Sequence, residues 1–460
     1  MEVYVEVRVL DETQSLCPKC LSPIQAKVVT DGIKVYMEKT CRNHGAFKAL
    51  LWSDLSLYER TLKFTRKGRL PRFRVNTKRG CPYDCGLCSH HEQHTCLAII
   101  EVTDACNQLC PVCLADSRSL STWEPTLDEL KDAIKELLRQ EGGPTAIQFS
   151  GGEPTLRKDL PDIVATARDL GFKCIEVDTN GIELAKNPRL IKELAESGLS
   201  GVYLQFDGLT SDVYFTLRGA DLLRIKERAI KGCIDEELSV TLAMTVVKGV
   251  NDGQLWDVVK YAISVRAIGV NFQPFAALGR YPPSLFDPFD RTTISDVQIK
   301  VEEQSGGAVK ALDFVPIPCP DPRCSSLVYA CYDEERRIKV INRLADMEEL
   351  IDKYSLKDRF IEFDELIKSI ASELCCLEAY LGECRPQDLG SQLRLLLEHL
   401  KPQGFFSIGC HFAQDVWTVD LKRLKKCCVH ELRKQGCLVP FCLFNITAID
   451  GAKLYRGNKL

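Results

Sequence analysis

Hydrophobic and polar positions follow two alternating periods between residues 97 and 304. Short apolar runs predict buried strands at 97–104, 146–152, 173–181, 201–208, 239–249 and 265–275. Each strand precedes a stretch with the 3.6-residue period of an amphipathic helix, at 127–140, 159–170, 188–198, 222–233, 254–264 and 294–304. Successive strand–helix pairs predict an α/β fold with a parallel sheet and right-handed crossovers, curved into a partial (β/α)6 barrel over 98–315.

The segments on either side of this barrel follow other patterns. Residues 1–68 hold two short turns, Cys17-Pro-Lys-Cys20 and Cys41-Arg-Asn-His44, separated by a run typical of a hairpin. Such paired turns predict a small N-terminal module in which Cys17, Cys20, Cys41 and His44 bind one iron or zinc ion. A remote cysteine in place of His44 is the alternative. Residues 316–460 predict a cysteine-rich C-terminal domain with helices at 345–354, 363–374 and 391–400.

The spacing C-x3-C-x2-C occurs twice, in two different settings. Cys81, Cys85 and Cys88 lie in a loop over 69–97, where Cys96 follows as a fourth thiol. Cys106, Cys110 and Cys113 directly follow a predicted strand, with no further cysteine for the next sixty residues. Three thiolates can hold three irons of a 4Fe–4S cubane and leave the fourth open. The second loop therefore predicts a cluster with an open iron, and the first predicts a closed auxiliary cluster.

Composition narrows the class of protein. The chain has 23 cysteines, and clustered cysteines in a reducing compartment indicate metal sites more than disulfides. We expect Cys174, Cys233, Cys375, Cys376 and Cys384 to be ordinary free thiols. The net charge of −4 gives no basic field for nucleic acid. No signal-peptide pattern or membrane-spanning run is present, so the expected location is cytoplasmic.

Polar residues and glycines at the predicted strand ends complete a recognisable pattern. CNQLCPVC forms the second cysteine loop, and SGGEP ends the next strand. Residues 97–315 resemble the radical S-adenosylmethionine (SAM) superfamily, in which the open iron binds SAM and its reductive cleavage gives a 5′-deoxyadenosyl radical. The resemblance implies catalytic ligands Cys106, Cys110 and Cys113. It also implies SAM contacts at Gly151, Gly152, Glu153, Asp178, Asn180, Gln205 and Asp207. One departure is Val112, where the superfamily usually has an aromatic residue that touches adenine.

The layout of the whole chain is similar to archaeal tetraether lipid synthases and their macrocycle-forming relatives. CPKC, CRNHG, DTNGI, LQFDGL, NFQPF, PCPDPRC and PFCLFN carry this second resemblance. It implies an enzyme that joins the terminal methyl carbons of two phytanyl chains and cleaves two SAM molecules per bond. The implied cofactors are about three 4Fe–4S clusters, SAM and one mononuclear iron or zinc. The implied partners are an archaeal ether lipid, an electron donor such as ferredoxin and, for a lipid substrate, a membrane contacted peripherally. Further auxiliary ligands are expected among Cys319, Cys324, Cys331, Cys410, Cys428, Cys437 and Cys442.

A lipid substrate would require an apolar tunnel. Candidate linings are Phe272, Phe275, Phe286, Phe289, Phe405, Phe406 and Phe412, each of which is at least as well explained by ordinary packing. Arg157, Arg218 and Arg280 could meet a phosphate headgroup. The alternatives are a radical SAM enzyme that modifies a peptide or methylates a pterin-type cofactor, and a multi-cluster electron-transfer protein. A short polar pocket would favour the first of these alternatives.

Overall fold

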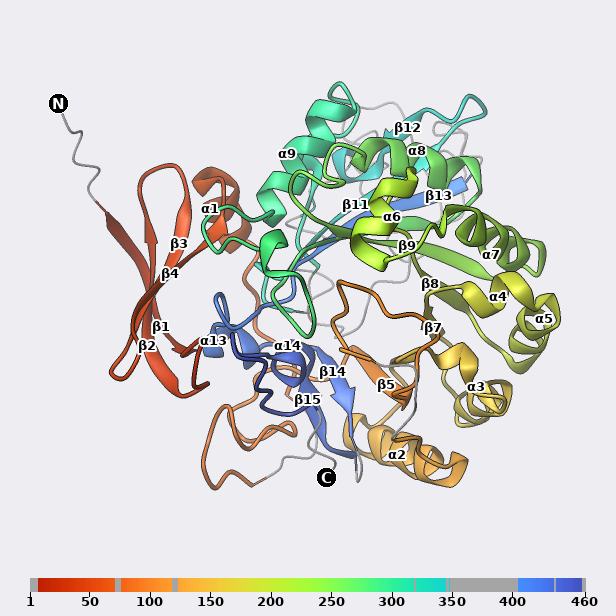
Figure 1. The fold of residues 1–460 in the computed structure, drawn as a ribbon, viewed down its shortest axis with the longest axis horizontal. Helices are drawn as coiled ribbons and strands as arrows, with labels where there is room; N and C mark the ends of the chain where they lie inside the picture. The colour runs from red at the N-terminus through yellow and green to blue at the C-terminus, as the bar shows by residue number, and fades with distance from the viewer. Residues whose placement is uncertain are drawn as a thin grey trace, which may run out of the picture.

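The computed structural model describes residues 7–70, 76–117, 123–317, 320–344, 347, 404–433 and 436–456. These residues form a four-stranded sheet and an eleven-stranded sheet. Figure 1 shows the smaller sheet at the N-terminal end, beside the larger sheet with its surrounding helices. The helices expected at 345–354, 363–374 and 391–400 lie outside the described residues except for Met347, as do Cys319, Cys375, Cys376 and Cys384.

The N-terminal sheet is an antiparallel meander. Its strands are β1 (Arg8–Leu16), β2 (Pro23–Thr30), β3 (Val35–Cys41) and β4 (Gly45–Trp52), each paired with the next. Helix α1 (Leu55–Leu62) follows, and its first turn is capped by Asp54, whose carboxylate accepts the Leu57 N–H. Of the four predicted metal ligands, Cys17 and Cys20 follow β1, Cys41 ends β3, and His44 lies in the turn before β4.

Six parallel strands in sequence order form the centre of the larger sheet. They are β5 (Leu97–Thr103), β6 (Ala146–Gly151), β7 (Ile175–Thr179), β8 (Gly201–Gln205), β9 (Ser239–Val246) and β10 (Gly269–Pro274). Every neighbouring pair is parallel, and each connection carries at least one helix. The predicted six-unit α/β barrel is therefore confirmed.

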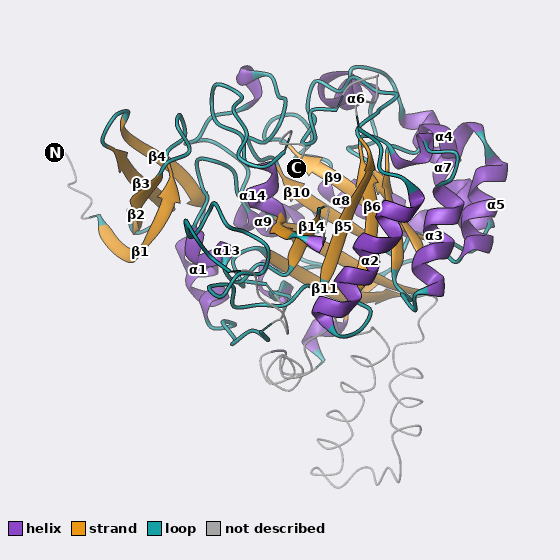
Figure 2. Cartoon of the chain, turned by 90° about the horizontal axis from the view of Figure 1, so that it is seen from below, coloured by secondary structure: helices purple, strands orange, loops and turns teal. Residues whose placement is uncertain are grey.

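The helices of these connections lie along one face of the sheet, as Figure 2 shows. They are α2 (Leu127–Glu141), α3 (Leu160–Asp169), α4 (Ile182–Lys186), α5 (Pro188–Ser197), α6 (Ser211–Arg218), α7 (Leu223–Asp235), α8 (Leu255–Ser264) and α9 (Ile294–Gln304). Short 3-10 helices cover Pro154–Leu156, Pro283–Leu285, Ala311–Asp313 and Ile341–Arg343. A capping box formed by Thr126 and Glu129 opens α2.

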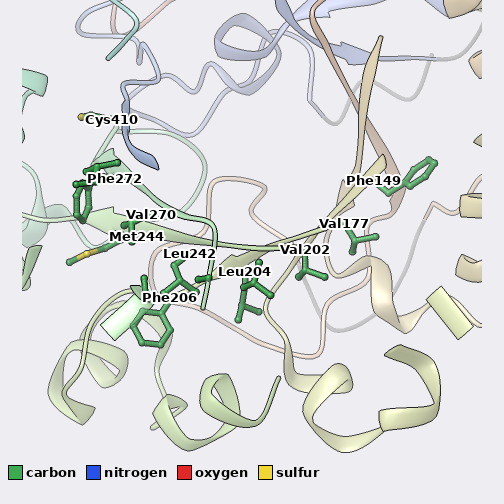
Figure 3. Packing of buried hydrophobic residues seen from close by; sticks show 14 of the residues in the cluster. Phe149, Val177, Val202, Leu204, Phe206, Leu242, Met244, Val270, Phe272 and Cys410 are labelled. Carbon is green, nitrogen blue, oxygen red and sulfur yellow. The ribbon is translucent and has the colours of Figure 1, made fainter. Parts of the chain in front are cut away.

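Alternation along each strand separates an apolar outer face from a polar inner face. The outward side chains pack against the helices in one continuous core, as Figure 3 shows for Phe149, Val177, Val202, Leu204, Leu242, Met244, Val270 and Phe272. The residues between them point to the other face, into the barrel. This inner face holds polar groups on nearly every strand, and the functional site is built on it.

Segments near the C-terminus extend both edges of the same sheet. Beyond β10 lie β13 (Gly404–His411), β11 (Ser325–Tyr332) and β12 (Ile338–Val340), and beyond β5 lie β14 (Val429–Leu432) and β15 (Leu438–Pro440). Helices α13 (Leu421–Leu424) and α14 (Phe441–Asn445) complete this region. Residues 325–340 and 404–440 thus continue the barrel sheet, and the segment 412–428 crosses from one edge to the other.

The N-terminal sheet packs on this crossing segment. Leu16 and Leu21 share a buried cluster with Val416, Val419 and other apolar residues of the C-terminal region. The buried ammonium of Lys39 donates hydrogen bonds to Ser15 Oγ (2.9 Å) and to Val416 O (2.7 Å). Burial lowers the pKa of Lys39 to about 7. No helix among the described residues has the length and apolarity needed to cross a bilayer.

Candidate active site and metal centres

The loop that carries Cys106, Cys110 and Cys113 follows β5 at the carboxyl-terminal end of the barrel strands. Main-chain hydrogen bonds fix it on two sides. Cys113 N–H donates to Arg280 O (2.8 Å), and Arg280 N–H donates back to Cys113 O (2.9 Å). Val112 N–H donates to Leu217 O (3.2 Å), and the Val112 side chain is buried against Val213, Val247 and Phe275. Val112 therefore packs into the protein.

The spacing of the three thiols fits a cluster better than a single ion. Four ligands around one tetrahedral ion at 2.3 Å are separated by about 3.8 Å. Among the described residues, only Cys17, Cys20, Cys41 and His44 bring three or more ligand atoms within 4.8 Å of one another. Cys106, Cys110 and Cys113 are spaced more widely, although their charges influence one another. The residues present therefore fit a larger iron–sulfur centre.

Burial raises the pKa of the Cys106 thiol to about 12, and the charge of Glu153 adds to this shift. Burial also raises the pKa of Cys110, while the nearby Arg218 guanidinium opposes the increase. The charge of Cys113 acts on both of these thiols, so the three cysteines of the loop lie close to one another.

The glycine pair Gly151-Gly152 is required by close packing on the cysteine loop. A Cβ on Gly151 would lie 2.2 Å from Thr103 O, and one on Gly152 would lie 2.0 Å from Ala105 O. Gly152 N–H donates to Thr103 O (2.8 Å), so β6 is fastened to the start of the loop. The glycines bring two main-chain segments together beside the cluster ligands.

Glu153 is occupied by hydrogen bonds within the protein. Its carboxylate accepts hydrogen bonds from Thr155 N–H (3.1 Å), Thr179 Oγ1 (2.6 Å) and Asn180 N–H (2.7 Å). Its own N–H donates to Ala105 O (2.8 Å). Glu153 therefore links the end of β6 to the end of β7, which makes it a positioning residue in this structure.

Two arginines hold the cysteine loop from opposite sides. Arg218 forms a bidentate pair with buried Asp207 (2.7 Å for both bonds) and donates to Val112 O (2.9 Å). Burial alone would lower the pKa of Arg218, but the charge of Asp207 outweighs burial and raises it. Arg280 donates to Cys110 O (3.0 Å) and pairs with Asp116 (2.9 Å). Both guanidiniums donate hydrogen bonds to main-chain oxygens of the cysteine loop, in place of the phosphate contact considered from the sequence.

Lys226 of α7 supports two of the residues predicted to contact SAM. Its buried ammonium donates to Asn180 O (2.5 Å) and to Gln205 Oε1 (3.1 Å). Burial lowers the pKa of Lys226 to about 8. Asn180 also donates from its side chain to Asn107 Oδ1 (2.8 Å), which connects the end of β7 to the cysteine loop.

The barrel interior next to this site is lined by polar side chains. Tyr203 O–H accepts hydrogen bonds from Asn271 Nδ2 (2.7 Å) and Gln273 Nε2 (2.8 Å). Asn271 Oδ1 is buried and has no hydrogen-bond partner in the described residues. Asp178 accepts a hydrogen bond from Ser150 Oγ (3.1 Å), and burial raises the pKa of Asp178 to about 7.

A second group of carboxylates lies where β14 joins β5. Glu431 pairs in register with Ile99, so its side chain faces the barrel interior, as does that of Glu101. Glu101 forms an ion pair with Arg456 (2.5 Å). Glu431 is 2% exposed. Burial raises its pKa well above the usual range, and the charge of Glu101 raises it further.

The four predicted ligands of the N-terminal module converge as expected. Cys17, Cys20, Cys41 and His44 bring one ligand atom each within 4.8 Å of one another. His44 Nδ1 lies 3.5 Å from both Cys17 Sγ and Cys41 Sγ. Hydrogen bonds from Ser22 lower the pKa of the Cys20 thiol to about 6, which favours the thiolate that binds metal. This donor set fits one tetrahedral zinc or iron ion.

Cys437, which is distant in the sequence, lies beside the first cysteine loop. Cys81, Cys85 and Cys88 influence one another's charge, and Cys437 Sγ lies 3.2 Å from Cys85 O. Tyr455 O–H donates to Pro82 O (2.6 Å). Its pKa is raised, mainly by burial, and the charges of Cys85 and Cys437 add to this shift. Cys437 is thus placed as a fourth thiol for this loop. Cys96, the fourth ligand predicted from sequence, precedes β5, and its N–H donates to Cys428 O (2.8 Å).

The remaining cysteines of the C-terminal region fall into two groups. Cys410 lies on the outer face of β13 in the main apolar core, and Cys331 is buried within β11. Neither has another cysteine among the charges that shift its pKa. Cys324, Cys427, Cys428 and Cys442 instead lie close enough for their charges to interact.

The aromatic residues predicted to line a tunnel are mainly packing residues. Phe272, Phe406 and Phe412 belong to the main apolar core, Phe275 packs on Val112, and Phe289 is exposed. Arg157 donates to Val102 O (2.9 Å) and pairs with Asp159 (2.6 Å). Among the described residues, the side chains named here other than Phe289 pack in the apolar core or bind neighbouring main chain.

Sequence reasoning missed Lys226, Tyr203 and Glu431 as candidate functional residues. A signal existed for Lys226, which lies among the buried residues of an otherwise apolar helix face with Ala229, Ile230 and Cys233. The inward direction of Tyr203 follows from the strand period. Glu431 carries no comparable signal, because it depends on the pairing of β14 with β5.

Comparison with known proteins shows which families the barrel and the N-terminal module resemble. The pattern of the radical SAM superfamily matches residues 100–262, and that of the HMPTM N-terminal zinc ribbon domain matches residues 9–53. The chain is 35% identical to the 7,8-dihydro-6-hydroxymethylpterin dimethyltransferase of Methanocaldococcus jannaschii, over 94% of this chain and 93% of that protein. It is 32% identical to a probable GTP 3',8-cyclase of Thermococcus kodakarensis, over 37% of this chain and 53% of that protein.

Among solved structures, Streptococcus suis SuiB aligns with a TM-score of 0.37 and 15% identity over 46% of each chain. The match to the pterin dimethyltransferase extends over nearly the whole length of both proteins, zinc ribbon included. The chain is a radical SAM enzyme and belongs to the family of the 7,8-dihydro-6-hydroxymethylpterin dimethyltransferase of Methanocaldococcus jannaschii.

Proposed function

We propose that this enzyme methylates carbon atoms of a reduced pterin related to 7,8-dihydro-6-hydroxymethylpterin. The observation that carries the proposal is the 35% identity to a pterin dimethyltransferase over 94% of the chain. This reading was the alternative to lipid coupling in the sequence analysis. The proposal extends a relative's activity to this chain, and the polar lining of the barrel supports it.

The chemistry of the barrel interior favours a pterin over an isoprenoid chain. A pterin ring presents N–H donors on its amino-pyrimidinone edge beside a carbonyl acceptor. Asn271 Oδ1 offers a buried acceptor without a partner in the described residues, and Glu431 is a buried carboxyl that faces the barrel interior. Tyr203, Gln273 and Asp178 lie on strands of the same sheet. A phytanyl chain in this position would offer no hydrogen bond to the polar groups of the barrel interior.

The chain's own residues would prepare the site in three ways. Cys106, Cys110 and Cys113 would hold a 4Fe–4S cluster, which supplies the reductive cleavage of SAM when it is bound. Arg218 and Arg280 fix the cysteine loop through the main-chain oxygens of Val112 and Cys110. Lys226 orders Asn180 and Gln205 at the strand ends where SAM is expected to bind.

The function can be tested by expressing the chain in a bacterial host that makes 7,8-dihydro-6-hydroxymethylpterin. We expect mass spectrometry of the extracted pterins to show added methyl groups. A Cys110→Ala variant is the control, because it lacks one ligand of the SAM cluster and should give only the unmethylated pterin. This arrangement lets the cell provide the electron donor and the methyl source.

The other readings give different results in parallel experiments. Lipid coupling would convert archaeol-type lipids to tetraether or macrocyclic lipids in a host that makes them, with the pterins unchanged. A peptide-modifying enzyme would leave both pools unchanged while the purified protein still formed 5′-deoxyadenosine from SAM and dithionite. An electron-transfer protein would form no 5′-deoxyadenosine. Unmethylated pterins in the presence of intact, SAM-cleaving protein would refute the proposal.

A further inference from the structure

The last described part of the chain, residues 446–456, forms a short hairpin directly after α14. Thr447 and Lys453 pair in an antiparallel bridge, and Ala448 N–H donates to Ala452 O (2.8 Å). We call this segment the C-terminal hairpin. It lies more than three hundred positions from the three-cysteine loop in the sequence, yet its hydrogen bonds reach that loop and two other cysteine-bearing segments.

Two of these contacts hold the hairpin at its own position. Ile449 N–H donates to Pro18 O (2.9 Å), in the turn of the zinc ribbon that carries its first two ligands. Tyr455 O–H donates to Pro82 O (2.6 Å) and accepts the Cys85 N–H (3.3 Å), both in the first cysteine loop. The hairpin is therefore fixed at two sites before it meets the loop of the SAM cluster.

The contact with the three-cysteine loop is a series of charged side chains. Lys453 Nζ lies 3.0 Å from Asp116 Oδ2, and Asp116 Oδ1 accepts a hydrogen bond from Arg280 Nη1 (2.9 Å). Arg280 Nε in turn donates to Cys110 O (3.0 Å). Asp116 N–H also donates to Cys113 O (3.1 Å). The charge of Lys453 is thus connected to the main chain of two cluster ligands.

Main-chain packing reinforces the same connection. Gly279 N–H donates to Thr447 Oγ1 of the hairpin (3.0 Å), immediately before Arg280 in the chain. A Cβ on Gly279 would lie 2.2 Å from Leu114 O, and the φ of this glycine is +62°. Residues 279–280 therefore lie directly between the hairpin and the cysteine loop, with no room for a side chain at the first position.

The ion pairs in this series are partly shielded from water. The side chains of Lys453 and Asp116 are 20% and 25% exposed. Partly buried pairs are screened less by salt than exposed ones, and a carboxylate with a cation on each oxygen has one preferred orientation. Asp116 also has a φ of +52°, a region that non-glycine residues adopt only where their surroundings hold them. Lys453 is one of the groups that hold it.

We propose that Lys453 is a positioning residue for SAM binding, which fixes Asp116 and Arg280 and through them the main chain of the cysteine loop. Lys453 contacts neither the cluster nor SAM. Its removal should leave the three thiol ligands in place and allow the loop to move, so the open iron would be presented to SAM less precisely. The proposal rests on the radical SAM chemistry and not on the pterin substrate, so the two proposals can fail separately.

The first test compares three full-length variants, reconstituted under anaerobic conditions. We expect Lys453→Met to weaken equilibrium binding of SAM by roughly fivefold at unchanged iron content, since one partly buried ion pair is lost. Lys453→Arg should restore the affinity, because it keeps the charge. The matched control is Lys260→Met, which removes an exposed ammonium paired with Asp257 on α8 (2.7 Å). At a fixed SAM concentration, the change that SAM causes in the EPR spectrum of the reduced cluster should be smaller in Lys453→Met alone.

The second test needs no cluster. Hydrogen exchange of the main chain at 106–117, measured before reconstitution, should be faster in Lys453→Met than in the unmutated protein and unchanged in Lys260→Met. If Lys453 acts through Asp116, the double variant with Asp116→Asn should exchange no faster than Asp116→Asn itself.

Three results would overturn the proposal. They are unchanged SAM affinity in Lys453→Met, additive effects in the double variant, and a loss of iron that accounts for the whole loss of SAM binding, which would make Lys453 a residue of general stability. Lys453→Gln takes the place of Lys453→Met in both tests if the latter does not fold.

Discussion

The side chains nearest the three-cysteine loop are charged and buried, and each holds a neighbouring segment of main chain. Lys226, Arg218 and Glu153 together make hydrogen bonds that join the loop to the ends of β6, β7 and β8. Buried charges are costly unless they are paired or hydrogen-bonded, so these groups fix one arrangement of the strand ends. These hydrogen bonds therefore limit how far the strand ends around the expected SAM site can move.

Lys226→Met should weaken SAM binding by roughly tenfold or more, because it removes hydrogen bonds from a charged donor to Asn180 O and Gln205 Oε1. The matched control is Lys231→Met, which removes an exposed ammonium from the same helix. Equilibrium binding of SAM to reconstituted protein under anaerobic conditions gives the measurement. Equal affinity in both variants would show that Lys226 does not position the SAM site.

Asp178→Asn should stabilise the protein more at pH 8.5 than at pH 5. Burial raises the pKa of Asp178 to about 7, whereas an unfolded aspartate has a pKa near 3.8. Between these values the folded state binds more protons than the unfolded state, so this group makes stability fall as pH rises. The neutral amide removes that dependence.

Melting temperatures of the unmutated protein and of Asp178→Asn, measured between pH 5 and pH 8.5, test whether this carboxyl lowers stability as pH rises. We expect the variant to melt a few degrees higher at pH 8.5, and to melt higher by a clearly smaller margin at pH 5, which lies only a little above the unfolded pKa. Asp169→Asn, on the exposed end of α3, controls for a general effect of charge removal. A gain that is larger at low pH would contradict the burial of the Asp178 carboxyl.

Strands and helices were the part of the structure most accessible from the sequence. The six strand–helix pairs were predicted because buried parallel strands and amphipathic helices leave different periods in the chain. The short strands β12 and β15, and the pairing of β13 and β14 with β10 and β5, leave no such periodic signal. The three-cysteine loop was predicted from spacing and position, while Cys437 reaches the first cysteine loop only through tertiary contact.

Gly152→Ala should destabilise the protein and lower the iron content of the SAM cluster. Its Cβ would lie 2.0 Å from Ala105 O, so either β6 or the cysteine loop must shift, at a cost of about 1–3 kcal/mol. Gly143→Ala is the control, since a Cβ there meets no atom within 4 Å. Denaturant unfolding with iron analysis should separate the two, and equal behaviour would refute the close packing.

The zinc ribbon, the crossing segment and the barrel form one connected body. Lys39 of the ribbon donates to Val416 O, and Thr13 donates to Asp420 (2.6 Å), both in the segment between the two sheet edges. Loss of metal from the ribbon should therefore also destabilise the crossing segment 412–428, which lies outside the first 53 residues. This link was not visible in the sequence, because its partners lie some four hundred positions apart.

Cys20→Ala should remove about one metal ion per chain and lower the melting temperature, because a structural metal contributes folding energy directly. It should also speed up proteolysis within 412–428, where the ribbon packs. Cys174→Ala provides a control at an exposed cysteine outside the metal sites. Normal metal content and stability in Cys20→Ala would count against the ribbon site.

The most direct test of the whole account is equilibrium binding of 7,8-dihydro-6-hydroxymethylpterin to reconstituted, SAM-loaded protein under anaerobic conditions. The account predicts saturable binding that weakens roughly tenfold or more in Glu431→Leu, where the buried acceptor facing the barrel interior is lost. It predicts unchanged binding in Glu236→Leu, which alters an exposed carboxylate at the end of α7. Absence of pterin binding, or tight binding of a phytanyl lipid in the same assay, would contradict it.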